Sequence, residues 1–413
     1  MSNSREHADA LFLRIAQATR DGRGITRESY GAGEECALRI LEQEAQAMGL
    51  CSYRDALQNV WFYLAEDTLQ EPCIIIGSHA DSVPQGGNFD GLAGIIAGLL
   101  VLKELKKSHH RTTPPVRVLA LRGEESAWYG KAYMGSSALL GKLDPAYLLN
   151  PHRTGEQTLG EAMHAAGVAV QYILEGKALV QPHQVMAYLE LHIEQGPVMV
   201  ARQWPIAWVT GIRGNIRHNA IRCVGQAGHS GAVPRWLRKD ALLAVAELLS
   251  RLDEHWRVLL QMGLDMVMTA GICNTLAHSQ AVSVIPGEVQ FSFEVRSQQP
   301  ETLARFYDLM RQECVAIEKS RGVSFVFSPQ ISTPPAQMDA LWSEKLRCAA
   351  EKKGHKLESM ASGAGHDAAV FANSGIPAAM IFIRNENGSH NPDEAMDTDD
   401  FLMGVQLMLD ALS

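Results

Sequence analysis

The stretch CIIIGSHADSVPQGGNFDGLAGIIAGLLVLKELKK, residues 73–107, contains a short apolar run, a polar glycine-rich loop and a longer apolar run that ends in lysines. The first run is typical of a buried strand, and the last, with its basic end, is typical of a helix. A second apolar run, VRVLAL (116–121), follows and also ends in polar residues. This order predicts an α/β fold in which a mixed sheet is flanked by helices and ligands bind at the carboxyl ends of strands.

The sequence pattern changes near residue 214. Segments typical of strand, helix, strand, strand, helix and strand then follow one another, at 216–225, 239–262, 266–272, 289–296, 300–320 and 323–327. This βαββαβ order is typical of a ferredoxin-like unit, which is sufficient for a small domain of its own.

A return to the first pattern follows this unit. The paired prolines of ISTPPAQ (331–337) indicate a linker, after which helices and the buried strand AAMIFI (378–383) resume the α/β pattern. We therefore expect an α/β domain made of residues 1–213 and 332–413, with an inserted ferredoxin-like α+β domain of residues 214–331.

Composition limits the classes of function. The 413 residues, 46% of them apolar, provide enough material for two cores. With 37 basic and 46 acidic residues and no basic run, a nucleic-acid partner is not expected. No segment approaches the roughly 18 consecutive apolar residues of a membrane span, and the first residues lack the pattern of a secretory signal. Seven cysteines without a CxxC pair are typical of reduced thiols, so we expect a cytoplasmic protein.

Two residues of the glycine-rich loop, His79 and Asp90, are candidate metal ligands. An imidazole that binds a metal through one nitrogen usually donates its other N–H to a carboxylate or carbonyl, and Asp81 is placed to accept it. Glycines on both sides of Asp90 let the backbone bend its carboxylate toward His79. Taken alone, a histidine two residues before an aspartate is common by chance, and Asp90 could be a turn residue.

Ligand-type residues also follow the other apolar strands. Glu124 and Glu125 come after the strand at 116–121, and because neighbouring side chains point differently, one can bind a metal while the other acts as a base. His192 follows MAYLEL, and His390 follows AAMIFI. In isolation the glutamate pair could be a helix N-terminal charge, and a single histidine is more often a loop residue than a ligand.

The convergence of these residues at strand ends favours a metal site. Three imidazoles and two carboxylates suit two divalent ions of the zinc, manganese or cobalt kind, with one carboxylate bridging them. Two metals about 3.5–4 Å apart can share a water and lower its pKa toward neutrality. The placement therefore predicts a hydrolase with two divalent ions per subunit; the alternative is a catalytically idle metal-binding protein.

With these residues in view, the sequence resembles the M20 metallopeptidase-like family, and within it the subgroup of allantoate amidohydrolases and N-carbamoyl-L-amino-acid hydrolases. The resemblance runs over nearly the whole chain. Its motifs are GSHxDxVxxGGNxDG (77–91), EE (124–125), LHIEQG (191–196), GHSG (228–231), SGAGHDA (362–368) and SHNP (389–392).

The resemblance implies a ligand set. His79 and His192 would each bind one metal, and Asp90 would bridge the two ions. Glu125 and His390 would complete the two sites.

It also implies roles beyond the metals. Glu124 would be the general base. The inserted domain would act as a lid and form a homodimer, in which His229 reaches the active site of the partner subunit. Arg296 would pair with the substrate carboxylate, a task suited to a planar bidentate donor. The other matches near the substrate are Gln195, Gly363, Ala364 and His366.

The implied reaction is hydrolysis of a C–N bond in a carbamoyl (ureido) or amide group on a small carboxylate-bearing molecule, such as an N-carbamoyl-L-amino acid or allantoate. The alternative within the family is a dipeptidase or an N-acyl amino-acid deacylase. This sequence has EESAWY where the family usually has EEGSRF, and HSGAVPR in place of HAGTTPM. An asparagine that helps to hold the substrate carboxylate is Ser283 here. These departures place the specificity of the chain around Trp128, His229 and Ser283.

Overall fold

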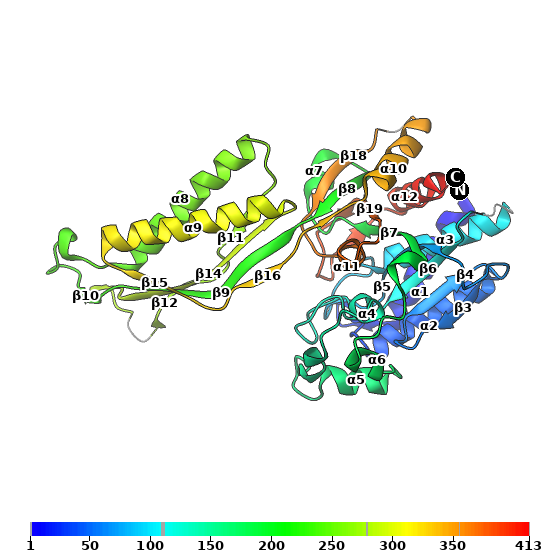
Figure 1. The fold of residues 1–413 in the computed structure, drawn as a ribbon, viewed down its shortest axis with the longest axis horizontal. Coiled ribbons are helices and arrows are strands. Elements are labelled where there is room, and N and C mark those ends of the chain that lie inside the picture. Colours follow the sequence, from blue (N-terminus) through cyan, green and yellow to red (C-terminus); the bar gives the residue numbers. More distant parts are fainter. Residues whose placement is uncertain (1, 109–111, 278–279, 355, 413) are drawn as a thin grey trace. The chain divides into compact units, whose positions relative to one another are not determined.

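A computed structural model of the chain describes residues 2–108, 112–277, 280–354 and 356–412. Its backbone contacts divide it into two units, each described by itself below. Unit 1 is Met1–Thr210 with Gln337–Ser413, and unit 2 is Gly211–Ala336. Unit 2 is therefore inserted into the sequence of unit 1, as the colours of Figure 1 show.

A mixed sheet is the centre of unit 1. Its order is β17-β8-β19-β7-β5-β6-β4-β3, with β18 beside β8. Strands β19, β7, β5 and β6 are parallel neighbours, whereas β8 and β4 run antiparallel to the strands beside them. The strands of this sheet are β3 Cys51–Arg54, β4 Val60–Tyr63, β5 Cys73–His79, β6 Val116–Leu121, β7 Val185–Ile193, β8 Ile206–Ile212, β17 Ala336–Gln337, β18 Glu358–Ser362 and β19 Ala378–Ile383. Two separate pairs are β1 Arg20–Asp21 with β2 Gly24–Ile25, and β20 Asn385–Glu386 with β21 Ala395–Met396. The predicted α/β class with a mixed sheet is confirmed.

Helices flank this sheet (Figure 1). They are α1 Ser2–Ala18, α2 Ala32–Ala47, α3 Leu92–Lys107, α4 Met134–Leu139, α5 Leu159–Ala165, α6 Gln171–Leu174, α7 Val198–Arg202, α10 Ala340–Lys352, α11 Asp367–Ala372 and α12 Thr398–Ala411, with short 3-10 helices η1 Pro145–Leu149 and η2 Pro182–Gln184. Helix α3 is apolar on nearly all sides because it packs on β5, β6 and β7 and is covered by α12. The helix predicted at the end of the stretch 73–107 is confirmed as α3, and the strand predicted at 116–121 is confirmed as β6.

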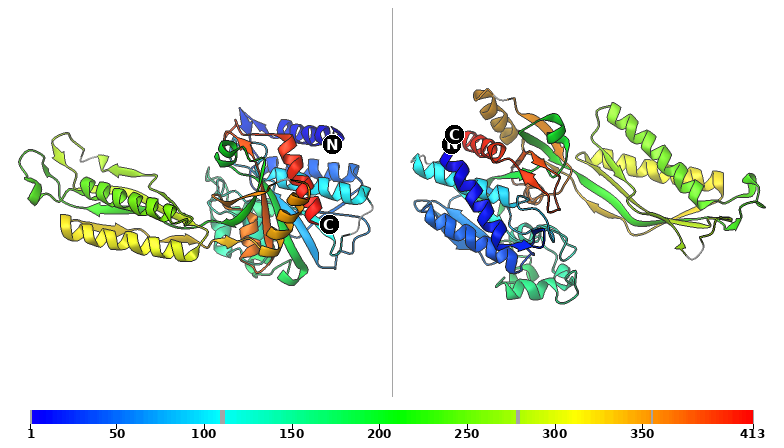
Figure 2. Two further views of the ribbon diagram at one scale, coloured as in Figure 1. Left: turned by 90° about the horizontal axis from the view of Figure 1, so that it is seen from above. Right: turned by 180° about the vertical axis from the view of Figure 1, so that it is seen from behind.

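Unit 2 consists of an antiparallel sheet and two long helices. Its elements are β9 Gly214–Val224, β10 Gly228–His229, η3 Arg235–Leu237, α8 Ala241–Gln261, β11 Val267–Thr269, β12 Cys273–Thr275, β13 Val284–Ile285, β14 Glu288–Ser297, α9 Pro300–Arg321, β15 Ser324–Phe327 and β16 Ile331–Thr333. The sheet order β11-β14-β9-β15 is that of a ferredoxin-like unit. Helices α8 and α9 pack against each other on one face of this sheet (Figures 1 and 2).

Two sequence predictions in unit 2 were wrong in detail. The strand expected at 266–272 is interrupted, because three residues, 270–272, stand opposite two residues of β14. This extra residue forms a bulge that contains Gly271, and the chain resumes pairing as β12. The expected linker 331–337 is partly strand, since β16 pairs with β9 before the paired prolines. In the described residues, no helix is long and apolar enough to cross a membrane.

Candidate metal centre

The ligand-type residues predicted from the sequence meet at one edge of the unit 1 sheet. His79 is the last residue of β5, and His192 is the last but one of β7. Glu125 follows β6, and His390 lies in the loop after β19. Because these strands are parallel neighbours, their carboxyl ends bring the four side chains together.

One group of potential ligand atoms comprises His79, Asp90 and His192, whose atoms lie within 4.8 Å of one another. The Asp90 Oδ1 atom is 3.4 Å from His79 Nε2 and 3.2 Å from His192 Nε2. This grouping differs from the expectation that the two histidines bind one metal each. Their strands are adjacent and their ring centroids are 5.7 Å apart, so both imidazoles belong to the same group.

A second group comprises Asp90, Glu125 and His390. His390 Nε2 is 3.4 Å from Asp90 Oδ2 and 3.3 Å from Glu125 Oε1. Hydrogen bonds to these two carboxylates raise the pKa of His390 to about 11. Asp90 is therefore common to both groups, with one oxygen turned to each, as a bridging carboxylate requires.

The buried nitrogens of the first group are arranged to receive a cation. His192 Nδ1 faces the backbone carbonyl of Ile193 at 2.9 Å, and His79 Nδ1 faces that of Asp81 at 3.2 Å. In the tautomer in which each Nδ1 donates to its carbonyl, each Nε2 keeps a lone pair, which is the form of histidine that binds a metal. The Asp90 Oδ1 atom between them is buried and accepts no hydrogen bond. Lone pairs of two imidazoles and a carboxylate that face one another fit a divalent ion.

Asp81 connects this group to the two glutamates. Its carboxylate accepts the backbone N–H groups of Glu124 and Glu125, both at 3.0 Å, and its Oδ1 lies 3.3 Å from His79 Nδ1. Although burial opposes a charged imidazole, the Asp81 and Asp90 carboxylates raise the pKa of His79 well above its usual value. The structure thus places Asp81 beside His79, as predicted, and shows that it also holds the loop after β6.

Glu124 is buried beside these groups. Burial raises the pKa of its carboxyl group well above the usual value; His79 opposes this shift and Glu125 adds to it. Its backbone is held at both ends, because its N–H donates to Asp81 and its carbonyl accepts the N–H of Tyr133. A fixed, buried carboxyl group next to candidate metal ligands has the placement of a general base.

Two loops place the other predicted residues of unit 1, one after β7 and one between β18 and α11. Gln195 Nε2 donates to Asp90 Oδ2 at 2.7 Å, so Gln195 contacts a candidate ligand directly. His366 is buried with its ring centroid 4.4 Å from that of His192, and burial and His192 lower its pKa well below the usual value. Ala364 accepts the hydroxyl of Ser362 through its backbone carbonyl, and its neighbour Gly363 is exposed.

The remaining predicted residues lie on unit 2. His229 and Ser283 are exposed on the ribbon formed by β10 and β13, where the Ser230 N–H donates to the carbonyl of Ser283. Arg296, on β14, forms a bidentate ion pair with Glu294, at 3.0 and 3.1 Å. The ribbon thus brings His229 and Ser283 together.

Sequence reasoning missed Glu190, which is completely buried in β7. Its carboxylate accepts the Ser78 hydroxyl at 2.8 Å and the Ala368 N–H at 3.0 Å, and it forms a further potential ligand group with His192 and His366. Each oxygen of the Glu190 carboxylate accepts one of these hydrogen bonds. The carboxylate therefore links β7 to β5 and α11. A charged residue within the apolar run MAYLEL was the signal that could have identified it.

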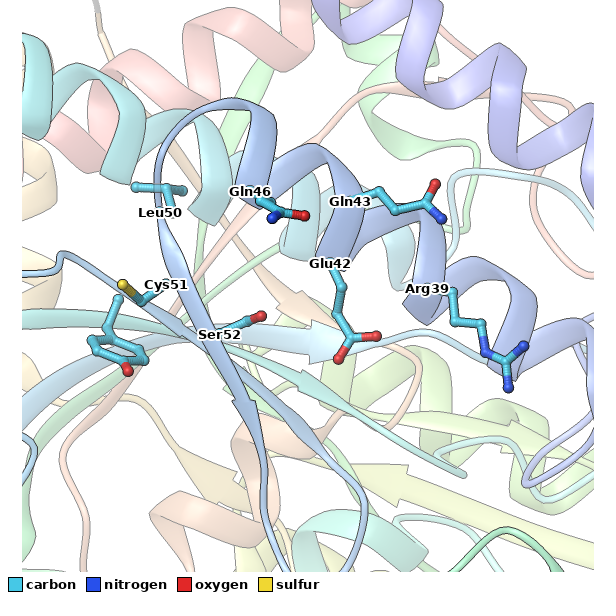
Figure 3. Close-up of a pocket in the computed structure, with 8 residues that line it drawn as sticks. Arg39, Glu42, Gln43, Gln46, Leu50, Cys51 and Ser52 are labelled. Atoms are coloured by element: carbon cyan, nitrogen blue, oxygen red, sulfur yellow. The ribbon is translucent and has the colours of Figure 1, made fainter.

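A surface hollow of about 550 Å³ lies between α2 and β3 (Figure 3). Its lining residues are Arg39, Glu42, Gln43, Gln46, Leu50, Cys51, Ser52 and Tyr63. None of them is a candidate ligand, and the guanidinium group of Arg54 pairs with both oxygens of Glu42. We assign this hollow no part in the chemistry.

The sequence matches peptidase family M20/M25/M40 over residues 75–413. It is 30% identical to an allantoate amidohydrolase of Bacillus subtilis, over 96% of this chain and 93% of the relative. An N-carbamoyl-L-amino-acid amidohydrolase of a Pseudomonas species is 27% identical over 94% of this chain and 93% of its own length. A crystal structure of a hydantoinase/carbamoylase family amidase from Burkholderia multivorans has a TM-score of 0.88 at 27% identity, over 99% of this chain and 97% of the amidase.

Proposed function

Because the chain belongs to peptidase family M20/M25/M40, we propose that it hydrolyses the C–N bond of a carbamoyl (ureido) or amide group on a small carboxylate-bearing molecule. An N-carbamoyl-L-amino acid or allantoate fits this description. Relatives that match it over nearly their whole length are named amidohydrolases, and this chain is an amidohydrolase too. The observation that carries the proposal is Asp90 shared by two potential ligand groups, with Glu124 buried beside them.

We propose that two divalent ions, of zinc, manganese or cobalt, bind in these groups. His79, Asp90 and His192 would hold one, and Asp90, Glu125 and His390 the other. Such ions, when bound, supply Lewis acidity toward the substrate carbonyl and acidify a nearby water. The oxygen and nitrogen ligands present suit all three metals.

Glu124 carries the proton in this proposal. Its carboxylate takes a proton from the attacking water while a bond forms between the water oxygen and the carbonyl carbon. When the C–N bond breaks, the carboxyl group gives the proton to the leaving nitrogen. The backbone bonds to Asp81 and Tyr133 hold Glu124 in place for both transfers.

Unit 2 supplies the substrate contacts in this proposal. It acts as a lid and as the dimerisation surface, so that His229 of one subunit stabilises the oxyanion in the active site of the partner subunit. Arg296 binds the substrate carboxylate. Large apolar side chains exposed on α8 and η3 support a self-association surface; they are Trp236, Leu237, Leu242, Leu243, Val258, Leu260 and Met262.

We further propose a cytoplasmic location, because the seven cysteines are free in the described part of the chain. One assay separates the proposed function from the dipeptidase and deacylase alternatives. Purified protein supplied with manganese is tested with N-carbamoyl-L-amino acids, allantoate, ureidoglycolate, N-acyl amino acids and dipeptides. We expect ammonia release or carbamoyl cleavage; activity on N-acyl amino acids or dipeptides alone would contradict the proposal.

A further inference from the structure

The loop between β5 and α3 determines where Asp90 points. It spans residues 80–91 and reaches Asp90 through the segment GGNFD, in which Phe89 packs on Phe12 while the two glycines offer no side chain to hold the backbone. A loop of this kind keeps one conformation only if its backbone groups are bonded from outside. Two buried, oppositely charged side chains provide these bonds, and neither belongs to the candidate ligands.

The side chain of Arg27 donates hydrogen bonds to backbone carbonyl groups of the loop. It is 0% exposed, and its guanidinium group donates to the Ala80 carbonyl at 2.7 Å, the Asn88 Oδ1 atom at 3.2 Å and the Asp90 carbonyl at 3.5 Å. The backbone of Arg27 is fixed in turn, because it exchanges two hydrogen bonds with Ser82, both at 2.9 Å.

The side chain of Glu394 accepts hydrogen bonds from backbone N–H groups of the same loop. Its Oε1 atom accepts the N–H groups of Phe89 at 2.8 Å and Asp90 at 3.2 Å. The hydroxyl oxygen of Ser389 lies 2.8 Å from Glu394 Oε2 and also within hydrogen-bond distance of Asp90 Oδ2, and its one proton can be donated to either carboxylate. A side chain at Gly87 would collide with this carboxylate, since a Cβ atom there would lie 2.1 Å from its carboxyl carbon.

Arg27 and Glu394 come from opposite ends of the chain and meet on one loop. Arg27 also precedes residue 75, where the match to the peptidase family begins. A buried guanidinium group and a buried carboxylate are costly to desolvate, so their burial here requires bonds that compensate. The compensating hydrogen bonds include one from Arg27 to the Asp90 carbonyl and one from the Asp90 N–H to Glu394.

We propose that Arg27 and Glu394 are positioning residues for the metal centre: together they form a clamp that holds Asp90 in the orientation in which each of its oxygens faces one ligand group. The inference rests on the proposed metal centre. It assigns a role to Arg27, which precedes the residues that match the family model. It also gives the loop that contains His390 a second role, because Glu394 lies in the same loop.

The chain contains a matched control for this clamp. Arg23 and Asp393 come from the same two segments and form an ion pair at 3.0 Å. Their side chains are 77% and 63% exposed, and in the described part of the chain neither forms an ion pair or a side-chain hydrogen bond with residues 80–91. Arg23→Met and Asp393→Asn therefore remove charges of the same kind without touching Asp90.

The test measures Co²⁺ affinity by chelator competition, together with the visible absorption spectrum of the Co²⁺ protein. We expect Arg27→Met and Glu394→Met each to weaken Co²⁺ binding by about 10- to 100-fold, the usual effect of removing an outer partner of a metal ligand. Both should alter the Co²⁺ spectrum, and their combined effect should be smaller than the product of the single effects, because they hold one loop. The controls should stay within about twofold of wild type.

The outcomes separate the clamp from the metal centre. If wild type binds no Co²⁺, the proposed metal centre fails and the clamp with it. If wild type binds Co²⁺ and both clamp variants bind it as tightly with an unchanged spectrum, the clamp is wrong and the metal centre stands. Should Arg27→Met not fold, Glu394→Met decides alone, because methionine keeps the length of the side chain and removes the acceptor oxygens that bond Phe89 and Asp90.

Discussion

The first group of candidate metal ligands in unit 1 and the ribbon residues predicted to contact substrate on unit 2 have opposite environments. His79, Asp90 and His192 are each at most 3% exposed, and their outer atoms are bonded to backbone groups or to other side chains. His229 and Ser283 are exposed on a two-stranded ribbon. The first set is fixed by the core of its own unit, whereas the second lies on a surface.

This difference indicates that the candidate metal ligands and the predicted substrate contacts take up their positions in different ways. Side chains held by burial and outer hydrogen bonds are preorganised, so their geometry does not depend on substrate. Exposed side chains act on a substrate only when another surface closes over them. We therefore expect variants of unit 1 to change metal content or turnover, and variants of unit 2 to keep their metals and act through assembly, substrate binding or the oxyanion contact of His229.

The largest effect is expected for Glu124→Gln. The amide cannot take a proton from water, so kcat should fall by about 10²- to 10⁴-fold, while metal content stays that of wild type. The measurement is turnover of an N-carbamoyl-L-amino acid together with elemental analysis. Glu125→Gln is the matched comparison, because it should lose metal as well as turnover. Near-normal activity of Glu124→Gln would exclude it as the base.

The second largest effect is expected for substitution of His229, on the proposed lid. His229→Ala should retain its metals and lose about 10²- to 10³-fold in kcat, the loss typical of one oxyanion donor. If His229 acts across a dimer, mixing this variant with Glu124→Gln should restore part of the activity, since one site of each heterodimer then has both groups. Each variant incubated alone is the control. A mixture no more active than its components would contradict a shared site.

A smaller effect is expected for Arg296→Ala. Losing a charge-assisted bidentate contact should raise KM for carboxylate substrates by about 10- to 100-fold, with a lesser change in kcat. A substrate analogue with a carboxamide in place of the carboxylate is the control, and its KM should not respond to the substitution. Equal losses on both compounds would show that Arg296 supports unit 2 rather than the substrate.

The sequence predicted the parts of the site that lie next to long apolar runs. Strands β5 and β6 and helix α3 have mainly apolar sequences, so their ends, and with them His79, Glu124 and Glu125, could be located. Parallel strands place such ends at one edge, which is why convergence could be predicted without coordinates.

The outer partners of the site could not be predicted in this way. Arg27 and Glu394 reach the Asp90 loop from far away in the sequence, and each stands in a polar segment without periodic apolar residues. The grouping of His79 with His192 depends on which strands are adjacent, which no local pattern specifies. The bulge at Gly271 likewise arises from pairing with β14 and not from the run that contains it.

The smallest effect is expected for Glu294→Gln, which tests the ion pair between Glu294 and Arg296 on unit 2. Arg296 is held by both oxygens of Glu294, two residues away on β14, so a substrate carboxylate must compete with a carboxylate of the protein. Both side chains are partly exposed, and such pairs contribute at most about 1 kcal/mol. Glu294→Gln should therefore lower KM for carboxylate substrates by about two- to fivefold and leave the carboxamide analogue unchanged. If KM for carboxylate substrates rises instead, Glu294 orients Arg296 for binding, and unit 2 is preorganised in the same way as the metal centre.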